Sequence, residues 1–159
     1  MKSQDGFSLI EVMVVCAVIG ILSVVAIPSF NKLADTMRQR QGRAQVWTDI
    51  QRARQLAITR HSQVVMSIGV APSTTDQTSY SILIDSNGDR VAQSTERKFD
   101  YTMPKNVKLK SITLTPVDSL VFDVSGILQT GFTGGRIVIQ GKNSPDTLLV
   151  SAAGVVYRP

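Results

Sequence analysis

The sequence predicts an α+β protein in which a long N-terminal α-helix, with a transmembrane half and an amphipathic half, packs on a C-terminal antiparallel β-sheet domain. An apolar run of 24 residues, 7–30, stands near the N-terminus, and a helix crosses a bilayer core with roughly 20 residues. A segment with helical spacing of apolar residues follows over 31–62. The remainder, 63–159, consists of short β-type runs separated by turn residues.

The composition limits the class of protein. The chain has 159 residues, of which 43% are hydrophobic and 18% are charged, so it is neither disordered nor a multi-span membrane protein. About 130 residues follow the apolar run, which is enough to bury a modest core. Cys16 is the only cysteine and lies inside the apolar run. An internal disulfide is therefore excluded, and so is a thiol pair for metal or redox chemistry.

The positive charge of the chain is concentrated in one segment. The formal net charge is +5. Residues 32–60 hold seven basic and two acidic side chains, whereas residues 61–159 hold nine basic and eight acidic ones. The basic excess therefore belongs to the predicted amphipathic helix and not to the β-rich part.

The helix is expected to run from the apolar segment into the amphipathic one without a stop. Pro28 lacks an N–H and should kink the helix without necessarily ending it, and Gly42 weakens it by about 1 kcal/mol relative to Ala. Trp47 is expected in the core beneath the sheet. The apolar positions recur at spacings of three and four, or multiples of them: Leu33, Met37, Ala44, Trp47, Ile50, Ala53, Leu56 and Ala57. This second half needs a packing partner on one face.

The partner is predicted to be a sheet of antiparallel strands. Turn residues separate the β-type runs, and no helical pattern intervenes between them, which favours antiparallel pairing. The expected strands are 64–70, 80–86, 105–114, 119–124, 135–141 and 146–159.

Glu11 is an ionisable residue inside the apolar run. Such a residue is costly and indicates a function with a partner, although a carboxylate solvated among lipid headgroups is the structural alternative. A cut between Gly6 and Phe7 would place a free α-amino group where the apolar segment begins. The N-terminal end of a helix is already positive, so that amine would gain from a carboxylate on a neighbouring copy. Glu11 is therefore predicted to set the register between copies in an assembly.

Residues 6–13, GFSLIEVM, resemble the prepilin peptidase site of type IV pilins and type II secretion pseudopilins. A cleaved secretory signal fits less well, because the leader has one lysine and no Ala-x-Ala site follows. The resemblance implies removal of residues 1–6 by prepilin peptidase and N-methylation of Phe7. It also implies single-pass insertion in a bacterial inner membrane, a periplasmic C-terminal domain, and extraction into a filament by an assembly platform. Gly20 and Pro28 match positions where family helices are loosened in filaments.

The β-rich part resembles the GspH/FimT group of minor pilins and pseudopilins. The resemblance lies in residues 45–66, 80–90 and 121–128, and it implies a helix spine with a two-sheet β domain. Major pilins usually end in a cysteine-closed loop, so the absence of cysteine from the C-terminal part favours the minor class. The implied role is to start or cap a pilus or pseudopilus together with other pilins.

Two alternatives stay open beside that role. FimT-like pilins capture DNA during transformation through a C-terminal Gly-Arg-x-Arg patch. Here valine replaces the second arginine of that patch in residues 135–138, which leaves Arg136 and Arg158 as the candidate DNA contacts. A membrane-anchored periplasmic binding module that never polymerises is the other alternative. It would leave Glu11 and the Gly6–Phe7 junction unexplained.

A calcium loop is the candidate metal site. Asp85, Asn87 and Asp89 place oxygen ligands at alternate positions, and Glu96 is twelfth in the count. The flanking residues have the pattern of strands, however, whereas helices flank an EF-hand loop. In addition, Gly88 stands at position four of the loop, where an EF-hand needs glycine at position six. An Asn-Gly hairpin turn with capping aspartates is the favoured interpretation. Some pseudopilins bind calcium, which keeps the ion as an alternative; no other cofactor is expected.

The sequence gives no support to an enzyme. It contains no phosphate-binding loop, nucleophile elbow, paired His-Glu zinc motif or dinucleotide fingerprint. His61 is the single histidine, and at a helix end it is interpreted as a partner of the helix dipole.

Overall fold

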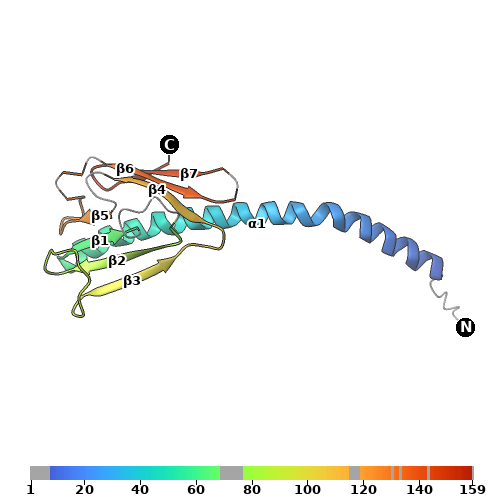
Figure 1. The fold of residues 1–159 in the computed structure, drawn as a ribbon, viewed down its shortest axis with the longest axis horizontal. Helices are drawn as coiled ribbons and strands as arrows, with labels where there is room; N and C mark the ends of the chain where they lie inside the picture. The colour runs from blue at the N-terminus through green and yellow to red at the C-terminus, as the bar shows by residue number, and fades with distance from the viewer. Residues whose placement is uncertain are drawn as a thin grey trace, which may run out of the picture. The chain divides into compact units, whose positions relative to one another are not determined.

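The computed structural model describes residues 8–68, 77–114, 119–129, 131–132, 134–142 and 144–158, so the Gly6–Phe7 junction lies outside the described residues. One helix, α1 (Leu9–Arg60), precedes the strands. These are β1 (Gln63–Ser67), β2 (Ser79–Asp85), β3 (Arg97–Thr102), β4 (Lys108–Leu114), β5 (Ser119–Phe122), β6 (Gly135–Gln140), β7 (Asp146–Val150) and β8 (Val156–Tyr157) (Figure 1). The predicted α+β class is confirmed.

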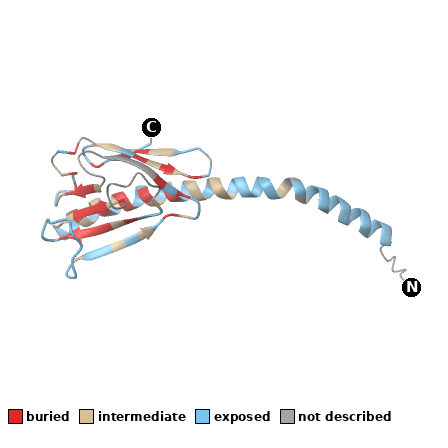
Figure 2. Ribbon diagram, in the orientation of Figure 1, coloured by how far each residue is buried: buried red, intermediate tan, exposed pale blue. Residues whose placement is uncertain are grey.

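The chain divides between Ala34 and Asp35 into two compact units. The first unit holds the apolar part of α1, whose described side chains are almost all exposed (Figure 2). Among the described residues, α1 alone is long and apolar enough to cross a membrane. It continues through Pro28 without a break, so the proline does not end the helix.

The second unit contains two antiparallel sheets. Sheet A has the order β3-β2-β1-β5, and sheet B has the order β4-β6-β7-β8. In sheet A, Val65 of the central strand β1 lies opposite Leu83 of β2 and Val121 of β5. In sheet B, β6 pairs with both β4 and β7. The two-sheet arrangement implied by the GspH/FimT resemblance is therefore confirmed.

Two features of the strand prediction are wrong. β3, with the sequence RKFDYT, was not predicted; it is an edge strand in which only Phe99 and Tyr101 are partly buried. Its exposed positions are mostly charged, as is common on edges, so the apolar signal is too sparse to detect. The expected strand 146–159 is two strands, β7 and β8, separated by a turn that needs glycine at Gly154 (φ 74°).

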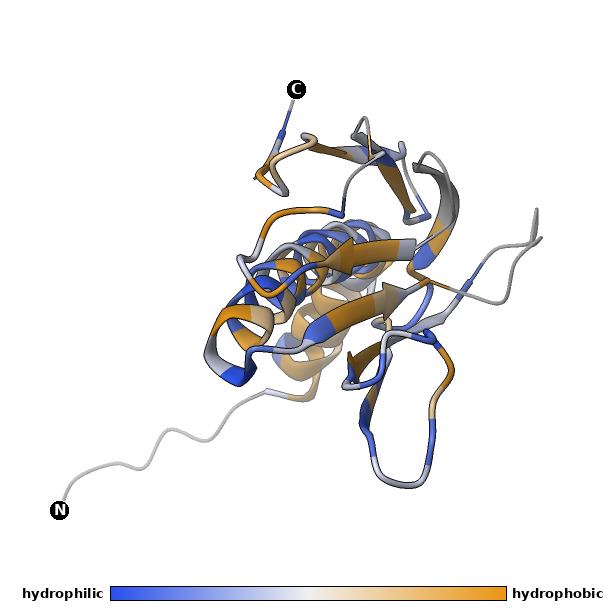
Figure 3. Ribbon diagram, turned by 90° about the vertical axis from the view of Figure 1, so that its left-hand side faces the viewer, coloured by the Kyte–Doolittle hydropathy of each residue, from blue (hydrophilic) through white to orange (hydrophobic). Residues whose placement is uncertain are grey.

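One core of buried side chains joins α1 to both sheets. Sheet A contributes residues such as Met66 and Ile82, and sheet B contributes residues such as Ile137 and Ile139, all fully buried. Figure 3 shows hydrophobic strands beside a helix in which hydrophobic and hydrophilic residues are mixed. The buried residues of the helix face that enters this core recur at helical spacing. They are Gly42, Val46, Asp49, Ile50, Ala53 and Ala57.

The expected burial of Trp47 is wrong, because its side chain is 46% exposed. The buried face runs through its neighbour Val46 instead. A Cβ added at Gly42, on that buried face, would lie 2.9 Å from Cγ1 of Val107. The close approach of the helix to the β3–β4 connection thus selects glycine at position 42, and it turns the face of Val46, not that of Trp47, toward the sheets. Leu33 and Met37, also expected in the packed stripe, are exposed.

A buried polar contact fixes α1 against sheet A. The Tyr80 hydroxyl of β2 donates a hydrogen bond to the Asp49 carboxylate, and both residues are buried. Gln45 Nε2 donates to the Tyr80 oxygen (3.1 Å) and to the Thr102 carbonyl of β3 (3.2 Å). Burial, together with the bond to Asp49, raises the pKa of Tyr80. The phenol therefore stays protonated and keeps its proton available to the carboxylate.

Tyr80→Phe should lower the free energy of unfolding by about 1–3 kcal/mol, because the buried Asp49 carboxylate loses its donor. Urea titration of the full chain in neutral detergent, followed by circular dichroism, measures the loss. Tyr101→Phe is the matched control, since within the described residues that hydroxyl accepts only an exposed hydrogen bond from Arg52 (3.0 Å). The change should cost less than about 0.5 kcal/mol. Equal losses for the two variants would contradict the role given to Tyr80.

Candidate functional site

Glu11 lies in the first turn of α1, and its side chain is exposed. A carboxylate is favourable at this end of a helix because the dipole is positive there. Among the described residues, the Glu11 carboxylate has no ion-pair partner. The acid is thus available at the start of the apolar helix, next to the Gly6–Phe7 junction that lies outside the described residues.

Gly20 and Pro28 both lie within the continuous helix α1. A Cβ added at Gly20 would meet no atom within 4 Å, so nothing in the described part of the chain requires glycine at this position. The expected loosening at these two residues concerns assembled filaments, and it stays a prediction.

The two candidate DNA contacts lie apart. Arg136 is exposed in β6, opposite Leu149 of β7. Arg158 follows β8, and its Nε lies 3.6 Å from Oδ1 of Asp146. Arg136, Leu149 and Tyr157 form one row across β6, β7 and β8, so Arg158 follows the residue that shares a row with Arg136. Asp146 lies opposite Ile139, whose side chain points to the other face of sheet B from that of Arg136. Because Arg158 faces this carboxylate, the two arginines lie on opposite faces and do not converge.

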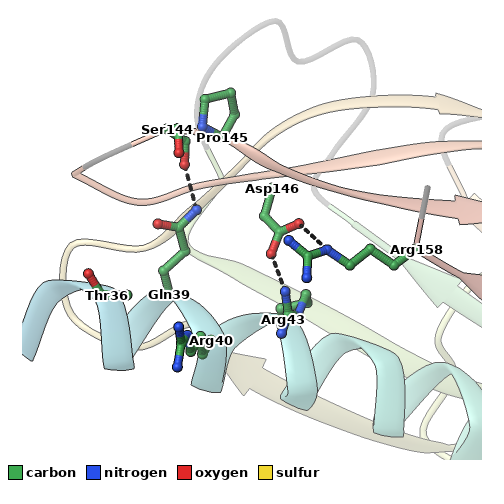
Figure 4. A pocket seen from close by; sticks show the side chains of 8 residues that line it. All are labelled: Thr36, Gln39, Arg40, Arg43, Ser144, Pro145, Asp146 and Arg158. Atoms are coloured by element: carbon green, nitrogen blue, oxygen red, sulfur yellow. Dashed lines mark hydrogen bonds and ion pairs between the residues drawn. The ribbon is translucent and has the colours of Figure 1, made fainter. Parts of the chain in front are cut away.

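Arg158 instead contributes to a pocket on the second unit, which we call the arginine pocket (Figure 4). Its volume is about 350 Å³. Three guanidinium groups and one carboxylate are the charged groups among its lining residues, which are Thr36, Gln39, Arg40, Arg43, Ser144, Pro145, Asp146 and Arg158.

Asp146 holds the arginine pocket together. Its Oδ2 accepts a hydrogen bond of 2.5 Å from Arg43 of α1, while its Oδ1 faces Arg158. Gln39 Nε2 donates to the carbonyl of Ser144 at 2.6 Å, so α1 has a second bond to the turn before β7. These contacts attach the helix to sheet B.

Sequence reasoning missed the arginine pocket. Arg40 and Arg43 are three residues apart, a spacing that places them on one side of a helix, and this was the available signal. Asp146 is more than a hundred positions further along the chain, and only the register of sheet B brings it to the helix.

The candidate calcium loop is the connection from β2 to β3, residues 86–96. The buried Asp85 carboxylate accepts hydrogen bonds from the N–H groups of Gly88 (2.6 Å) and Arg90 (2.9 Å). Asp89 accepts from the N–H of Val91 at 2.8 Å, and this bond holds the pKa of Asp89 below its usual range. The aspartates thus cap backbone donors, as the turn interpretation expects, although the connection is longer than a tight Asn-Gly turn.

The same loop has the donor set of a cation site. One carboxylate oxygen from each of Asp85, Asp89 and Glu96 lies within 4.8 Å of the others. Glu96 also accepts hydrogen bonds from the N–H groups of Ser86 (2.9 Å) and Gln93 (3.3 Å). All three carboxylates therefore already have protein donors, and calcium would have to compete with them. Calcium binding stays the untested alternative to the turn interpretation.

Two family models match the chain. The prokaryotic N-terminal methylation motif matches residues 1–27, which include the Gly6–Phe7 junction and Glu11. The model described as type II transport protein GspH matches residues 44–154, which include most of the second unit.

The chain is also similar in sequence to individual proteins. The chain is 33% identical over 104 residues to a fimbrial protein of Pseudomonas aeruginosa, and 32% identical over 104 residues to a second one. Each match spans 62% of this chain and 64% of the fimbrial protein, just under two thirds of its length.

The fold is similar to a solved structure. The crystal structure of the Pseudomonas aeruginosa type IV minor pilin FimU superposes with a TM-score of 0.57 at 17% identity, covering 80% of this chain and 92% of that one. A second crystal form gives a TM-score of 0.52 at 18% identity, covering 76% and 91%. At this identity the similarity shows the pilin fold.

Asp146→Asn should lower the free energy of unfolding by about 1–2 kcal/mol, because Arg43 loses a charged hydrogen-bond acceptor. The two side chains are only 26% and 16% exposed, so water replaces the contact poorly. Asp100→Asn removes one member of the Lys98–Asp100 pair, whose side chains are 45% and 71% exposed, and should cost less than about 0.5 kcal/mol. Chemical denaturation measures the free energy of unfolding of both variants. An Asp146→Asn variant as stable as Asp100→Asn would contradict the attachment to sheet B.

Calcium should leave the melting temperature of the chain unchanged at millimolar concentration, because Asp85, Asp89 and Glu96 already accept protein donors. Thermal unfolding with calcium and, in parallel, with magnesium checks this expectation. A rise in melting temperature that calcium alone produces, and that Asp89→Asn abolishes, would instead establish a calcium loop.

Proposed function

The chain belongs to the GspH family of type II transport proteins, the family of minor pilins and pseudopilins, and we propose that its task is to start or cap a pilus or pseudopilus. Members of this family are structural proteins and not enzymes. The observation that carries the proposal is the arrangement of one helix: a methylation motif, an apolar segment with a single carboxylate, and a second half built into a pilin-type β domain.

Processing is the first step that we propose. Prepilin peptidase would cut between Gly6 and Phe7, remove residues 1–6 and methylate the new N-terminus at Phe7. The match of residues 1–27 to the N-terminal methylation motif supports this step. The chain is thus the substrate of the peptidase.

Membrane storage is the second step. The first unit would anchor the chain once in the inner membrane, with the second unit in the periplasm, until an assembly platform extracts it. Its exposed apolar side chains, from Leu9 to Phe30, support this step. Removing apolar surface from water is favourable by about 25 cal/mol per Å², so these side chains are unstable in contact with water. Lipid before extraction and neighbouring helices afterwards would cover them.

Glu11 would act during extraction. Its carboxylate is unpaired within the described chain, and processing creates a cation four residues before it. A pair between Glu11 of one subunit and the N-terminus of a neighbour neutralises both charges in an apolar filament core. Any other register leaves two uncompensated charges in apolar surroundings, which is unfavourable by several kcal/mol.

The second unit also presents apolar groups on its helix. Met37, Trp47 and Ile58 are 58%, 46% and 44% exposed, although they lie on a helix whose opposite face is buried in the core. These side chains suit contact with neighbouring subunits and support the assembly role over a chain that never polymerises.

DNA capture is the alternative role. Affinity for nucleic acid grows with the number of phosphates neutralised, so a DNA contact surface needs several aligned cations. Arg136 and Arg158 do not converge, and Arg158 faces the carboxylate of Asp146 at 3.6 Å. The arrangement of these two residues therefore favours assembly over DNA capture.

Glu11→Ala should leave cleavage and membrane insertion intact and abolish incorporation into filaments, because the new N-terminus then has no acid to pair with. Immunoblotting of sheared filaments and membranes from cells that express each variant measures incorporation, and intact mass measures cleavage. Glu11→Asp, which keeps the charge, should retain partial incorporation. Normal incorporation of the Glu11→Ala variant into filaments would contradict the proposed role of Glu11 in setting the register between subunits.

A further inference from the structure

The arginine pocket carries more positive charge than its own carboxylate neutralises (Figure 4). Asp146 is the single carboxylate among the lining residues, and it lies within 4 Å of Arg43 and Arg158 but is not paired with Arg40. Beside the pocket, Arg38 and Lys142 share one further carboxylate, Asp35, at 3.0 and 3.6 Å. Both groups therefore keep a positive excess, and the ligand that suits the pocket is an anion.

Two of the three guanidinium groups have donors to spare. Arg43 is held by its 2.5 Å bond to Asp146, so it is fixed before any ligand arrives. Arg158 is 66% exposed and lies 3.6 Å from the same carboxylate, which is too long for a hydrogen bond. Arg40 is exposed and has no hydrogen bond or ion pair within the described part of the chain. Arg40 and Arg158 thus present free N–H groups from two sides of the pocket.

We propose that the arginine pocket binds the phosphate group of an anionic phospholipid. Guanidinium groups match a phosphate because they offer two parallel N–H bonds to its oxygens. A volume of about 350 Å³ is at the small end of ligand pockets and suits a headgroup better than a larger metabolite.

The position of the pocket in the sequence favours lipid as the source of the phosphate. Arg40 stands ten residues after Phe30, the last residue of the apolar run, which is about 15 Å of α-helix. A chain anchored by that run tethers the second unit to a membrane, whose anionic lipids attract basic side chains. The proposal rests on membrane anchoring and not on incorporation into a filament, so the two can fail separately.

The test uses the full chain in neutral detergent micelles, titrated with short-chain phosphatidylglycerol. Short-chain phosphatidylcholine and inorganic phosphate are titrated in parallel, and the NMR shifts of the arginine side-chain N–H groups report binding. We expect saturable binding of phosphatidylglycerol, weakened roughly fivefold by either Arg40→Ala or Arg158→Ala. Arg136→Ala is the matched control, because it removes an equal charge from β6 and should change nothing.

Four results would overturn the proposal. Equal weakening by Arg40→Ala, Arg158→Ala and Arg136→Ala would show that the lipid responds to net charge only, and no weakening by any of them would show that the lipid does not bind in the pocket. Inorganic phosphate bound as tightly as phosphatidylglycerol would remove the lipid as the source. Duplex DNA that binds more tightly than the lipid, with binding lost in Arg40→Ala, would assign the pocket to nucleic acid. Arg40 and Arg158 are exposed, so their variants should fold, and circular dichroism verifies this.

Discussion

A single 52-residue helix has to be stable in two kinds of surroundings, and the rest of the structure depends on this requirement. Its first part exposes apolar side chains on every side and needs lipid or other helices around it. Its second part buries one face in the core of a β domain. In the proposed transfer from membrane to filament, the surroundings of the first part change, whereas the core around the second part can stay as it is.

Polar contacts give the helix its orientation on the two sheets. The apolar core favours packing but is not directional, so it would tolerate small rotations of α1. The Asp49 carboxylate accepts a hydrogen bond from Tyr80 of sheet A, and Arg43 donates a hydrogen bond to Asp146 of sheet B. A rotated helix would break both contacts and leave the buried Asp49 carboxylate without its donor, which is costly. The same orientation leaves Met37 and Trp47 on the exposed side.

The sequence was sufficient for features that depend on neighbouring residues and insufficient for those that depend on distant ones. The apolar run, the leader motif and most strands were predictable, because composition and alternation determine them locally. Trp47 was placed wrongly because hydrophobicity alone does not say which of two apolar rows meets the sheets; the close approach at Gly42 decides that. β3 was missed because an edge strand buries few side chains, and the arginine pocket was missed because it joins residues far apart in the chain.

The measurement that tests the proposed role most directly is intact mass spectrometry of this chain from sheared filaments and from membranes of the cells that make it. We expect filaments to contain the chain beginning at N-methylated Phe7, and membranes to contain the same processed form awaiting assembly. A chain that retains residues 1–6, or a processed chain confined to membranes under conditions where filaments form, would contradict a role as a filament subunit.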